Sequence, residues 1–438
     1  MSRKDFDFII IGGSTAGNVV AGWLAQSPNA SVLIIEARKG NPRGETMITT
    51  PARAFETRGS EYDWAYKTTF IDRPDYTRVE KPNTRGKILG GSSCLNYYTW
   101  IPGSAATLTI GRSLVSVTYH DDEGLYSKDL AKVCKGGPLH VAHADLIPEM
   151  APFRDALTQA WTSKGEPVSE DIYSGEMHGL THCINSIYKG LRSSSYVFVE
   201  GKPNITILAD THSKKIIIED GVASGVAVFE QNGEELIFCA KKEVIVSSGV
   251  FESPKLLMLS GLGSEKELVA HGIKTLVKSE HVGQNLLDHP IFPYVFQVLE
   301  GLGLEEHLLR AGPSNDGAPT FSDAFQWHIP TPPAGAWLTV IVDLLRPISQ
   351  NGTVKLNSAD PLVQPNININ FFSNDLDIIA MRQGVRFVDD ILRTGEGFKD
   401  IIGDDYPRPM PRNSDEAMNK MILERSQTGF HPCGTTRL

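Results

Sequence analysis

Residues 6–17 read Phe-Asp-Phe-Ile-Ile-Ile-Gly-Gly-Ser-Thr-Ala-Gly, a short apolar run that leads into a glycine-rich turn. The apolar run is typical of a buried strand. Apolar residues at helical spacing follow through residues 19–24, and residues 31–35, Ser-Val-Leu-Ile-Ile, form a second apolar run. Strand, turn, helix and strand in this order open a doubly wound sheet. The sequence therefore predicts an α/β fold.

The glycine-rich turn has the residues that a dinucleotide site needs. Gly12 suits the tight turn and Gly17 suits close packing of helix on strand, while Ser14 takes the position where the backbone approaches a pyrophosphate. The first amides of the helix would hold that pyrophosphate. Glu36 follows the second strand, where an acid hydrogen-bonds ribose hydroxyls. This pattern favours dinucleotide binding over a glycine-rich turn without a ligand, and it leaves FAD and NAD open.

The composition excludes several classes of function for this 438-residue chain. A net charge of −10 does not suit general nucleic-acid binding, which needs clustered lysine and arginine. No apolar run approaches the ~20 residues that span a bilayer. No secretory leader precedes residue 6, and the five scattered cysteines form no Cys-x-x-Cys pair. We expect a cytoplasmic protein with reduced thiols and no nucleic-acid or membrane partner, and its oligomeric state stays unknown.

The rest of the chain predicts a second, sheet-containing domain inserted into the first. Helices are expected at residues 151–164, 374–394 and 415–427 from their apolar spacing. Strands are expected at residues 205–208, 216–218, 222–229, 236–238, 244–246, 337–345 and 354–371.

Four further stretches stand out. Residues 85–99 contain two glycines followed by two serines, which suit a backbone that crosses close to a flat ring, although a capped helix after a turn explains the same residues. In residues 248–263 we expect Ser253 as a helix N-cap and Pro254 as its first-turn proline. The other two stretches are residues 281–290 and 430–438.

Together these stretches resemble the glucose–methanol–choline (GMC) oxidoreductases, FAD enzymes that oxidise alcohols and related donors. Residues 85–103 and 249–263 are similar to the two family signatures, and residues 431–437 are similar to its His-Pro-x-Gly-Thr-x-Arg element. Stretches that look closer still to the fungal formate oxidase branch are residues 62–69, 81–96, 324–332 and 366–382.

The resemblance implies a two-domain α/β (α+β) architecture: a doubly wound, Rossmann-like FAD-binding domain and an antiparallel-sheet substrate or cap domain. The FAD domain would comprise residues 1–103 and 201–290, and residues 104–200 would be a divergent cap and connecting segment. The substrate domain would comprise residues 291–412, and residues 413–438 would begin the catalytic element.

The resemblance also implies roles for single residues. His431 would be the active-site base beside the flavin, His289 would be structural, and Cys433 would fill a variable position. The cofactor residues would hold the adenosine half at the first turn and at residue 213, and the pyrophosphate and isoalloxazine at residues 92–99. The full set is Gly12, Ser14, Thr15, Ala16, Gly17, Glu36, Ser92, Ser93, Asn96, Tyr97, Thr99 and Ser213.

The donor decides what chemistry the site needs. For an alcohol, a base of near-neutral pKa takes the hydroxyl proton while hydride moves to flavin N5, a task that suits histidine. Formate has no hydroxyl proton, so a cation must hold its carboxylate. In the formate oxidase branch the implied cation is an arginine beyond the His-Pro element. Formate, methanol-like alcohols, aryl alcohols and a biosynthetic intermediate stay open as small-molecule substrates, and oxygen or another acceptor would take the electrons.

Three stretches depart from the family pattern. Residues 104–118 lack its tryptophan-containing acidic helix, the loop around residues 301–320 looks shortened, and the sequence ends at Leu438 inside the third element. The family continues with a strand, a helix and a second catalytic residue. Besides an active FAD oxidoreductase, two alternatives therefore stand. One is a truncated or mis-spliced homologue that is inactive or only binds FAD, and the other is a non-enzymatic interaction protein on the same fold.

Overall fold

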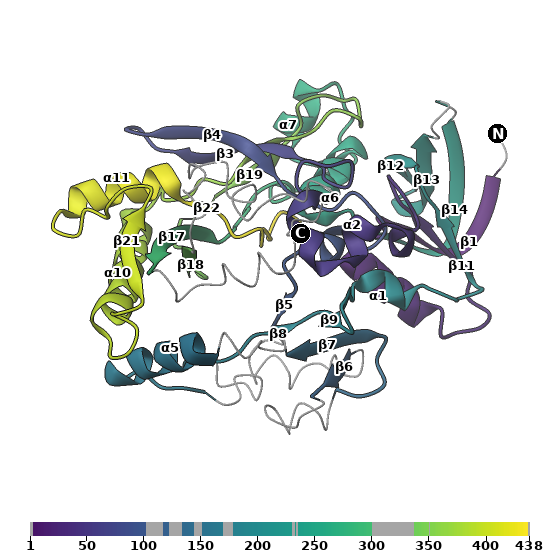
Figure 1. The fold of residues 1–438 in the computed structure, drawn as a ribbon. Helices are drawn as coiled ribbons and strands as arrows, with labels where there is room; N and C mark the ends of the chain where they lie inside the picture. The colour runs from purple at the N-terminus through teal and green to yellow at the C-terminus, as the bar shows by residue number, and fades with distance from the viewer. Residues whose placement is uncertain are drawn as a thin grey trace.

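The computed structural model describes residues 3–101, 117–121, 134–143, 151–169, 178–229, 233, 235–299, 337–349 and 351–436. A six-stranded sheet lies beside the N-terminus, in the order β11-β2-β1-β14-β13-β12 (Figure 1). The first four strands are mutually parallel, and β13 and β12 extend the sheet antiparallel to β14. Its strands are β1 (Arg3–Ile11), β2 (Val32–Ile35), β11 (Ile205–Leu208), β12 (His212–Glu219), β13 (Val222–Phe229) and β14 (Glu235–Val246).

Alternate residues of the parallel strands pack into two different cores, because successive side chains point to opposite faces of a strand. On one face Ile10 and Ile34 pack with Ala21 of helix α1 (Thr15–Leu24). On the other face Ile9 and Leu33 join the core that contains Leu256 of helix α6 (Gly249–Leu259). Helices therefore cover both faces, and the predicted doubly wound α/β fold is confirmed.

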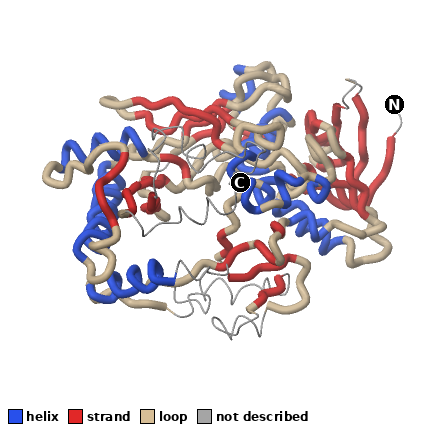
Figure 2. Tube along the Cα trace, in the orientation of Figure 1, coloured by secondary structure: helices blue, strands red, loops and turns tan. Residues whose placement is uncertain are grey.

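A second sheet lies at the other end of the molecule and is flanked by helices α10 and α11 (Figure 2). It has the order β18-β17-β21, and β22 also pairs with β17. These pairs are all antiparallel, as expected for the substrate domain. Its elements are β17 (Pro290–Val298), β18 (Trp337–Asp343), β21 (Ile402–Tyr406), β22 (Gln427–Thr428), α10 (Asp375–Thr394) and α11 (Asp415–Arg425).

Two smaller sheets join segments that are far apart in the chain. The first has the order β19-β20-β3-β4 and the second has the order β5-β8-β7-β6. Their strands are β3 (Tyr66–Asp72), β4 (Thr77–Asn83), β5 (Thr99–Trp100), β6 (Val117–His120), β7 (Leu139–His143), β8 (Ile184–Asn185), β19 (Thr353–Lys355) and β20 (Asn366–Asn368). The other elements include α2 (Thr46–Thr49), α5 (Ala151–Ser163), α7 (Glu265–Ala270), β9 (Ile187–Tyr188), β10 (Leu191–Arg192), β15 (Leu262–Gly263), β16 (Val277–Lys278) and the 3₁₀ turn η3 (Gly91–Cys94).

The start of helix α6 differs from the prediction. The helix begins at Gly249, so Ser253 and Pro254 lie inside it and their expected roles as N-cap and first-turn proline are wrong. A proline inside a helix leaves the carbonyl four residues earlier without its amide donor. That carbonyl belongs to Val250, and it accepts a hydrogen bond of 2.7 Å from the hydroxyl of Thr435. The C-terminal element therefore compensates for the proline and allows the helix to start early.

Other predicted elements differ in extent. The strands expected at residues 236–238 and 244–246 are one continuous strand, β14, because its pairing with β1 continues past an irregularity at residues 6–8. The divergent residues 104–118 lie almost wholly outside the described residues, as does the loop at 301–320. None of the helices in the described part of the chain combines the length and apolarity needed to cross a bilayer.

Candidate active site

The first glycine turn is held by close backbone contacts. Gly12 has a φ of +98°, a conformation that side chains disfavour. A Cβ at Gly12 would lie 2.7 Å from the carbonyl oxygen of Ser247, and one at Gly17 would lie 2.3 Å from that of Gly12. Ser14 is the N-cap of α1, and its Oγ accepts a 3.2 Å hydrogen bond from the amide of Gly17. The start of α1 can therefore meet the turn after β14 only where side chains are absent.

Glu36 lies at the end of β2 and is only 6% exposed. Its carboxylate accepts hydrogen bonds from the amides of Gly13 and Arg38, each 3.1 Å long. Burial raises the pKa of Glu36 to about 7, because desolvation outweighs these hydrogen bonds. A carboxyl group with this pKa gains its full charge only above neutral pH unless a ligand supplies further donors.

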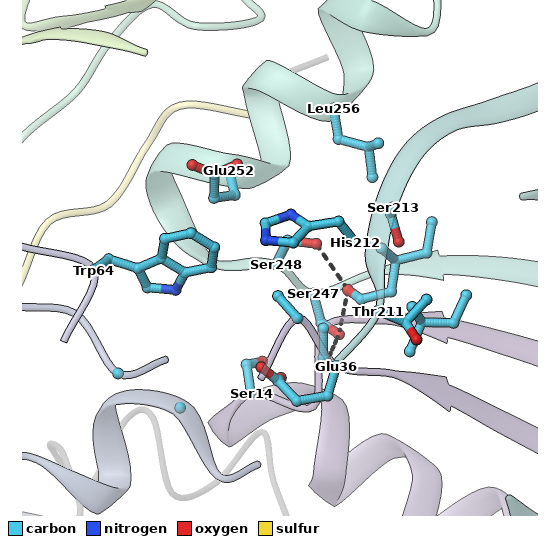
Figure 3. Close-up of a pocket in the computed structure, with 16 residues that line it drawn as sticks. Ser14, Glu36, Trp64, Thr211, His212, Ser213, Ser247, Ser248, Glu252 and Leu256 are labelled. Carbon is cyan, nitrogen blue, oxygen red and sulfur yellow. Dashed lines mark hydrogen bonds between the residues drawn. The ribbon is translucent and has the colours of Figure 1, made fainter. Parts of the chain in front are cut away.

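A cavity opens between the ends of β1, β2 and β14 and the first turn of α1. Glu36 and Ser14 line it on one side, and His212 of β12 and Trp64 line it on the other (Figure 3). The rings of Trp64 and His212 meet edge to face with centroids 5.6 Å apart. Four of the predicted cofactor residues line this cavity: Gly12, Ser14, Glu36 and Ser213.

The second motif lies against the first turn of α1. A Cβ at Gly91 would come within 3.1 Å of the Cα of Ser14, and the hydroxyl of Thr15 donates to the carbonyl of Gly90 at 3.3 Å. A second cavity lies here, bordered by the exposed side of α1 and the strands β5 and β7. The predicted residues that line this second cavity are Thr15, Ser93, Asn96 and Thr99.

The remaining predicted cofactor residues line neither cavity. Ala16 is exposed on the first turn of α1 and Gly17 is buried beneath it. Ser92 Oγ accepts from the amide of Gly86 at 3.2 Å, within the turn of the second motif. Tyr97 is 38% exposed and packs on Phe55, with ring centroids 4.9 Å apart.

His431 lies in the loop after β22, where a buried carboxylate holds it. Asp288 is 1% exposed, and its Oδ1 accepts from the amides of His289 at 2.8 Å and His431 at 2.9 Å. Its Oδ2 accepts from the hydroxyl of Thr428 at 2.5 Å. One side chain therefore fixes the backbone of both histidines. Burial raises the pKa of Asp288, and the nearby guanidinium of Arg85 partly opposes this rise.

The two imidazoles contact each other. Nδ1 of His431 lies 3.3 Å from Nδ1 of His289, with the rings nearly perpendicular. Nδ1 of His289 also lies 3.7 Å from Oδ2 of Asp343 at the end of β18. Withdrawal of part of the ring from water lowers the pKa of His431, and the neighbouring His289 lowers it further. His431 is therefore neutral near pH 7, and a neutral imidazole can accept a proton.

Two family models match most of this sequence. The model of the N-terminal part of GMC oxidoreductases matches residues 6–291, and that of the C-terminal part matches residues 347–438. The chain belongs to the GMC oxidoreductase family. The resemblance noted in the sequence is confirmed, and so is FAD as the cofactor of this GMC oxidoreductase.

Solved structures and characterised relatives agree with this assignment. A crystal structure of formate oxidase superposes with a TM-score of 0.94 at 50% identity, covering 100% of this chain and 89% of the other. A formate oxidase from Aspergillus oryzae, studied for the effect of a mutation on FAD modification, has the same TM-score and identity. The oxygen-dependent choline dehydrogenase of Rhizobium johnstonii is 28% identical over 99% of this chain and 85% of its own length.

This GMC oxidoreductase is an FAD-dependent enzyme that acts on alcohol-type donors. Its homologues oxidise small-molecule substrates and use an electron acceptor such as oxygen. The residues present fit the cofactor. Two glycine turns leave the first turn of α1 bare of large side chains, as a pyrophosphate requires, and a buried acid lies at the end of β2.

Three residues that lie beside His431 were not among the site residues predicted from the sequence. His289 was expected to be structural, and no role was given to Asp288 or Asp343. Asp288 and His289 precede a proline in a stretch that stood out, which was a weak signal. Asp343 ends an ordinary strand, so only its pairing opposite Ile291 in β17 brings it to the site.

Proposed function

We propose that this enzyme transfers hydride from a small alcohol, aldehyde or formate-like donor to FAD, with His431 as the active-site base. The observation that carries the proposal is the position of His431: its backbone is fixed by Asp288 and its ring contacts His289. A base needs a lone pair at a fixed place, and this contact set restrains both the backbone and the ring.

The geometry of the two turns supports part of the cofactor set that the family resemblance implies. Glu36 would hold the ribose of the adenosine half, and the exposed first turn of α1 at Thr15 and Ala16 would face the phosphates. Ser213 would contact the adenine side through its backbone. The second motif would lie along the pyrophosphate and the ring system, through Ser92, Ser93, Asn96, Tyr97 and Thr99. Bound FAD would supply the hydride acceptor.

The work of the protein with an alcohol donor is to hold and move one proton. His431 is neutral at physiological pH, so its free ring nitrogen takes the hydroxyl proton as the carbon gives up hydride. His289 restrains the ring through its Nδ1, and Asp343 and Asp288 place carboxylates close to the pair. These negative charges favour the imidazolium that forms during the reaction.

The two kinds of relative support different donors. A formate oxidase at 50% identity supports formate, and choline dehydrogenases at 28% identity support an alcohol. Oxidation of an alcohol requires removal of its hydroxyl proton, whereas formate has no such proton. Loss of His431 should therefore abolish oxidation of an alcohol, whereas oxidation of formate should depend more on a cation that holds the carboxylate.

Anaerobic reduction of the flavin tests the proposal directly. The purified holoprotein is mixed with methanol, an aryl alcohol or formate, and the loss of visible flavin absorbance is followed. We expect one donor to bleach the flavin and His431→Ala to retain FAD but lose bleaching by an alcohol. Unchanged bleaching in His431→Ala would reject the base. Stoichiometric FAD without bleaching by any donor would favour a protein that only binds FAD, and absence of flavin would favour an interaction role.

A further inference from the structure

Two imidazoles and one carboxylate converge where β18 and β22 pair with β17. The ligand atoms of His289, Asp343 and His431 all lie within 4.8 Å of one another. The two Nδ1 atoms are 3.3 Å apart, and Nδ1 of His289 is 3.7 Å from Oδ2 of Asp343. No other group of three or more such ligands occurs among the residues that the structure describes. We therefore asked what could occupy this space.

The three ligands are presented by neighbouring strands, so their backbones are already in place. His289 precedes β17, Asp343 ends β18, and His431 follows β22, and both β18 and β22 pair with β17. Asp288 ties the amides of the two histidines to one carboxylate, and the amide of Gly429 donates to the carbonyl of His289 at 2.7 Å. A ligand that binds here does not have to order the backbone first, which reduces the entropic cost of binding.

The donor set matches a divalent transition ion. Zinc binds imidazole nitrogen at about 2.0–2.1 Å, and a tetrahedral site then separates two ligand atoms by roughly 3.4 Å. The observed 3.3 Å between nitrogens fits this value. The carboxylate of Asp343 lies 3.7 Å from Nδ1 of His289 and within 4.8 Å of the ligand atom of His431, so it must move closer to both when an ion binds. Two imidazoles and one carboxylate leave further positions for water, as in the open sites of such ions.

Charge and access also suit a cation. The carboxylates of Asp288 and Asp343 act on His431 as negative charges, and Arg85 is the positive side chain that opposes them. The side chain of His289 is 24% exposed and that of Asp343 is 28% exposed, so an ion can reach both from solvent. The cluster is therefore restrained by its backbone while its ligand atoms stay open to solvent.

We propose that His289, Asp343 and His431 bind one divalent first-row transition ion, represented by Zn²⁺, and that this ion inhibits the enzyme. The inhibitory part rests on the proposed function of His431 as base. A neutral imidazole has one nitrogen with a free lone pair, and an ion on Nδ1 of His431 occupies it. Nε2 then carries the ring proton, so no nitrogen of His431 is left to accept the hydroxyl proton of an alcohol. Water on the ion's open positions completes its coordination, and no redox change is involved.

Zn²⁺ binding to the holoenzyme can be measured by calorimetry after treatment with a chelator. We expect one ion per chain in the wild type. Asp343→Asn and His289→Gln should each weaken binding on the order of 100-fold, because each removes one ligand from the set. His271→Gln, which removes an imidazole at the end of α7, is the matched control and should bind as the wild type does. Equal affinity in Asp343→Asn, His289→Gln and the wild type would overturn the site, as would absence of binding to the wild type.

Co²⁺ provides a second readout that does not depend on activity. Its d–d absorption at wavelengths beyond the flavin bands should be intense in the wild type and absent from both ligand variants. Stopped-flow flavin reduction then separates the two proposals. Zn²⁺ that binds but leaves reduction by an alcohol unchanged would keep the metal site and reject its inhibitory role. Loss of reduction in His431→Ala without any Zn²⁺ binding to the wild type would keep the proposed function and reject the metal site.

Discussion

The imidazoles of His289 and His431 meet at 3.3 Å although 142 residues separate them in the chain. Their contact depends on Asp288, whose Oδ1 accepts from both backbone amides. The pairing of β22 with β17 brings the two loops together, and the buried carboxylate then sets their spacing. The position of the proposed base therefore depends on the pairing of β17 with β22 and on Asp288, and not on the sequence motif that contains His431 alone.

Substitution of Asp288 should loosen this junction. Asp288→Asn keeps the size of the side chain but removes the charge that two amides and one hydroxyl share. We expect a loss of about 1–3 kcal/mol in the free energy of unfolding and slower reduction of the flavin by an alcohol. Urea denaturation and stopped-flow absorbance measure the two effects. Asp404→Asn, at an exposed position of β21, is the control, and equal losses in both variants would contradict the assignment.

The pH dependence of flavin reduction should report His431. Its pKa is lowered from 6.5, so the neutral form persists to a more acidic pH than in a free histidine. With an alcohol donor the rate should fall only as the pH drops below about 6.5. His289→Gln removes a neighbour that lowers this pKa, and the acidic limb should therefore move up in pH. An identical limb in wild type and His289→Gln, measured by stopped flow, would contradict the coupling.

Glu36 should make the stability of the cofactor-free protein depend on pH. Its pKa is raised from 4.5 to about 7, so the folded state holds the proton more tightly than the unfolded state. The contribution of Glu36 to the free energy of unfolding is then fully present below pH 4.5 and is lost as the pH rises through 7. Relative to Glu36→Gln, the apoprotein should lose about 3 kcal/mol between these limits. Urea denaturation across this range tests the difference, and parallel curves for the two proteins would refute it.

Gly17 should tolerate no side chain. In Gly17→Ala the new Cβ would lie 2.3 Å from the carbonyl oxygen of Gly12 and 2.5 Å from Oγ of Ser247. Helix α1 must then move away from the turn, and we expect loss of bound FAD together with about 1–3 kcal/mol of stability. Gly59→Ala is the control, because nothing lies within 4 Å of its Cβ and only its φ of +68° opposes the change. Flavin content after purification measures the outcome, and full FAD in Gly17→Ala would exclude this packing role.

Thr435 should stabilise helix α6 from outside. Its hydroxyl donates to the carbonyl of Val250, which Pro254 leaves without an amide partner. Thr435→Val keeps the shape but leaves this partly buried carbonyl unpaired, at an expected cost of about 1–3 kcal/mol. Thr435→Ser retains the hydroxyl and should lose less. Thermal unfolding compares the variants, and equal stability of the valine and serine variants would rule out the hydrogen bond as the cause.

Much of the architecture followed from local patterns. The apolar run at residues 6–11 and the glycines after it specify a strand, a tight turn and a helix, since only glycine tolerates the φ of Gly12. Residues 374–394 alternate apolar and charged positions at helical spacing, and helix α10 occupies almost that range. The start of α6 was misplaced because its proline is compensated by Thr435, which is 185 positions from its hydrogen-bond partner Val250.

The sequence by itself determined the doubly wound sheet, because a strand, a glycine turn and a helix depend on residue types at short, regular spacing. Its separate motifs indicated the family, and FAD followed from that resemblance. Only the tertiary structure decided which side chains surround His431. Asp288 and His289 directly precede β17, whereas Asp343 ends β18 and His431 follows β22, and nothing in the sequence relates these three places. Strand pairing, which depends on the packing of the whole second sheet, brings the ligand atoms of His289, Asp343 and His431 within 4.8 Å of one another. It also creates the charge environment of the proposed base.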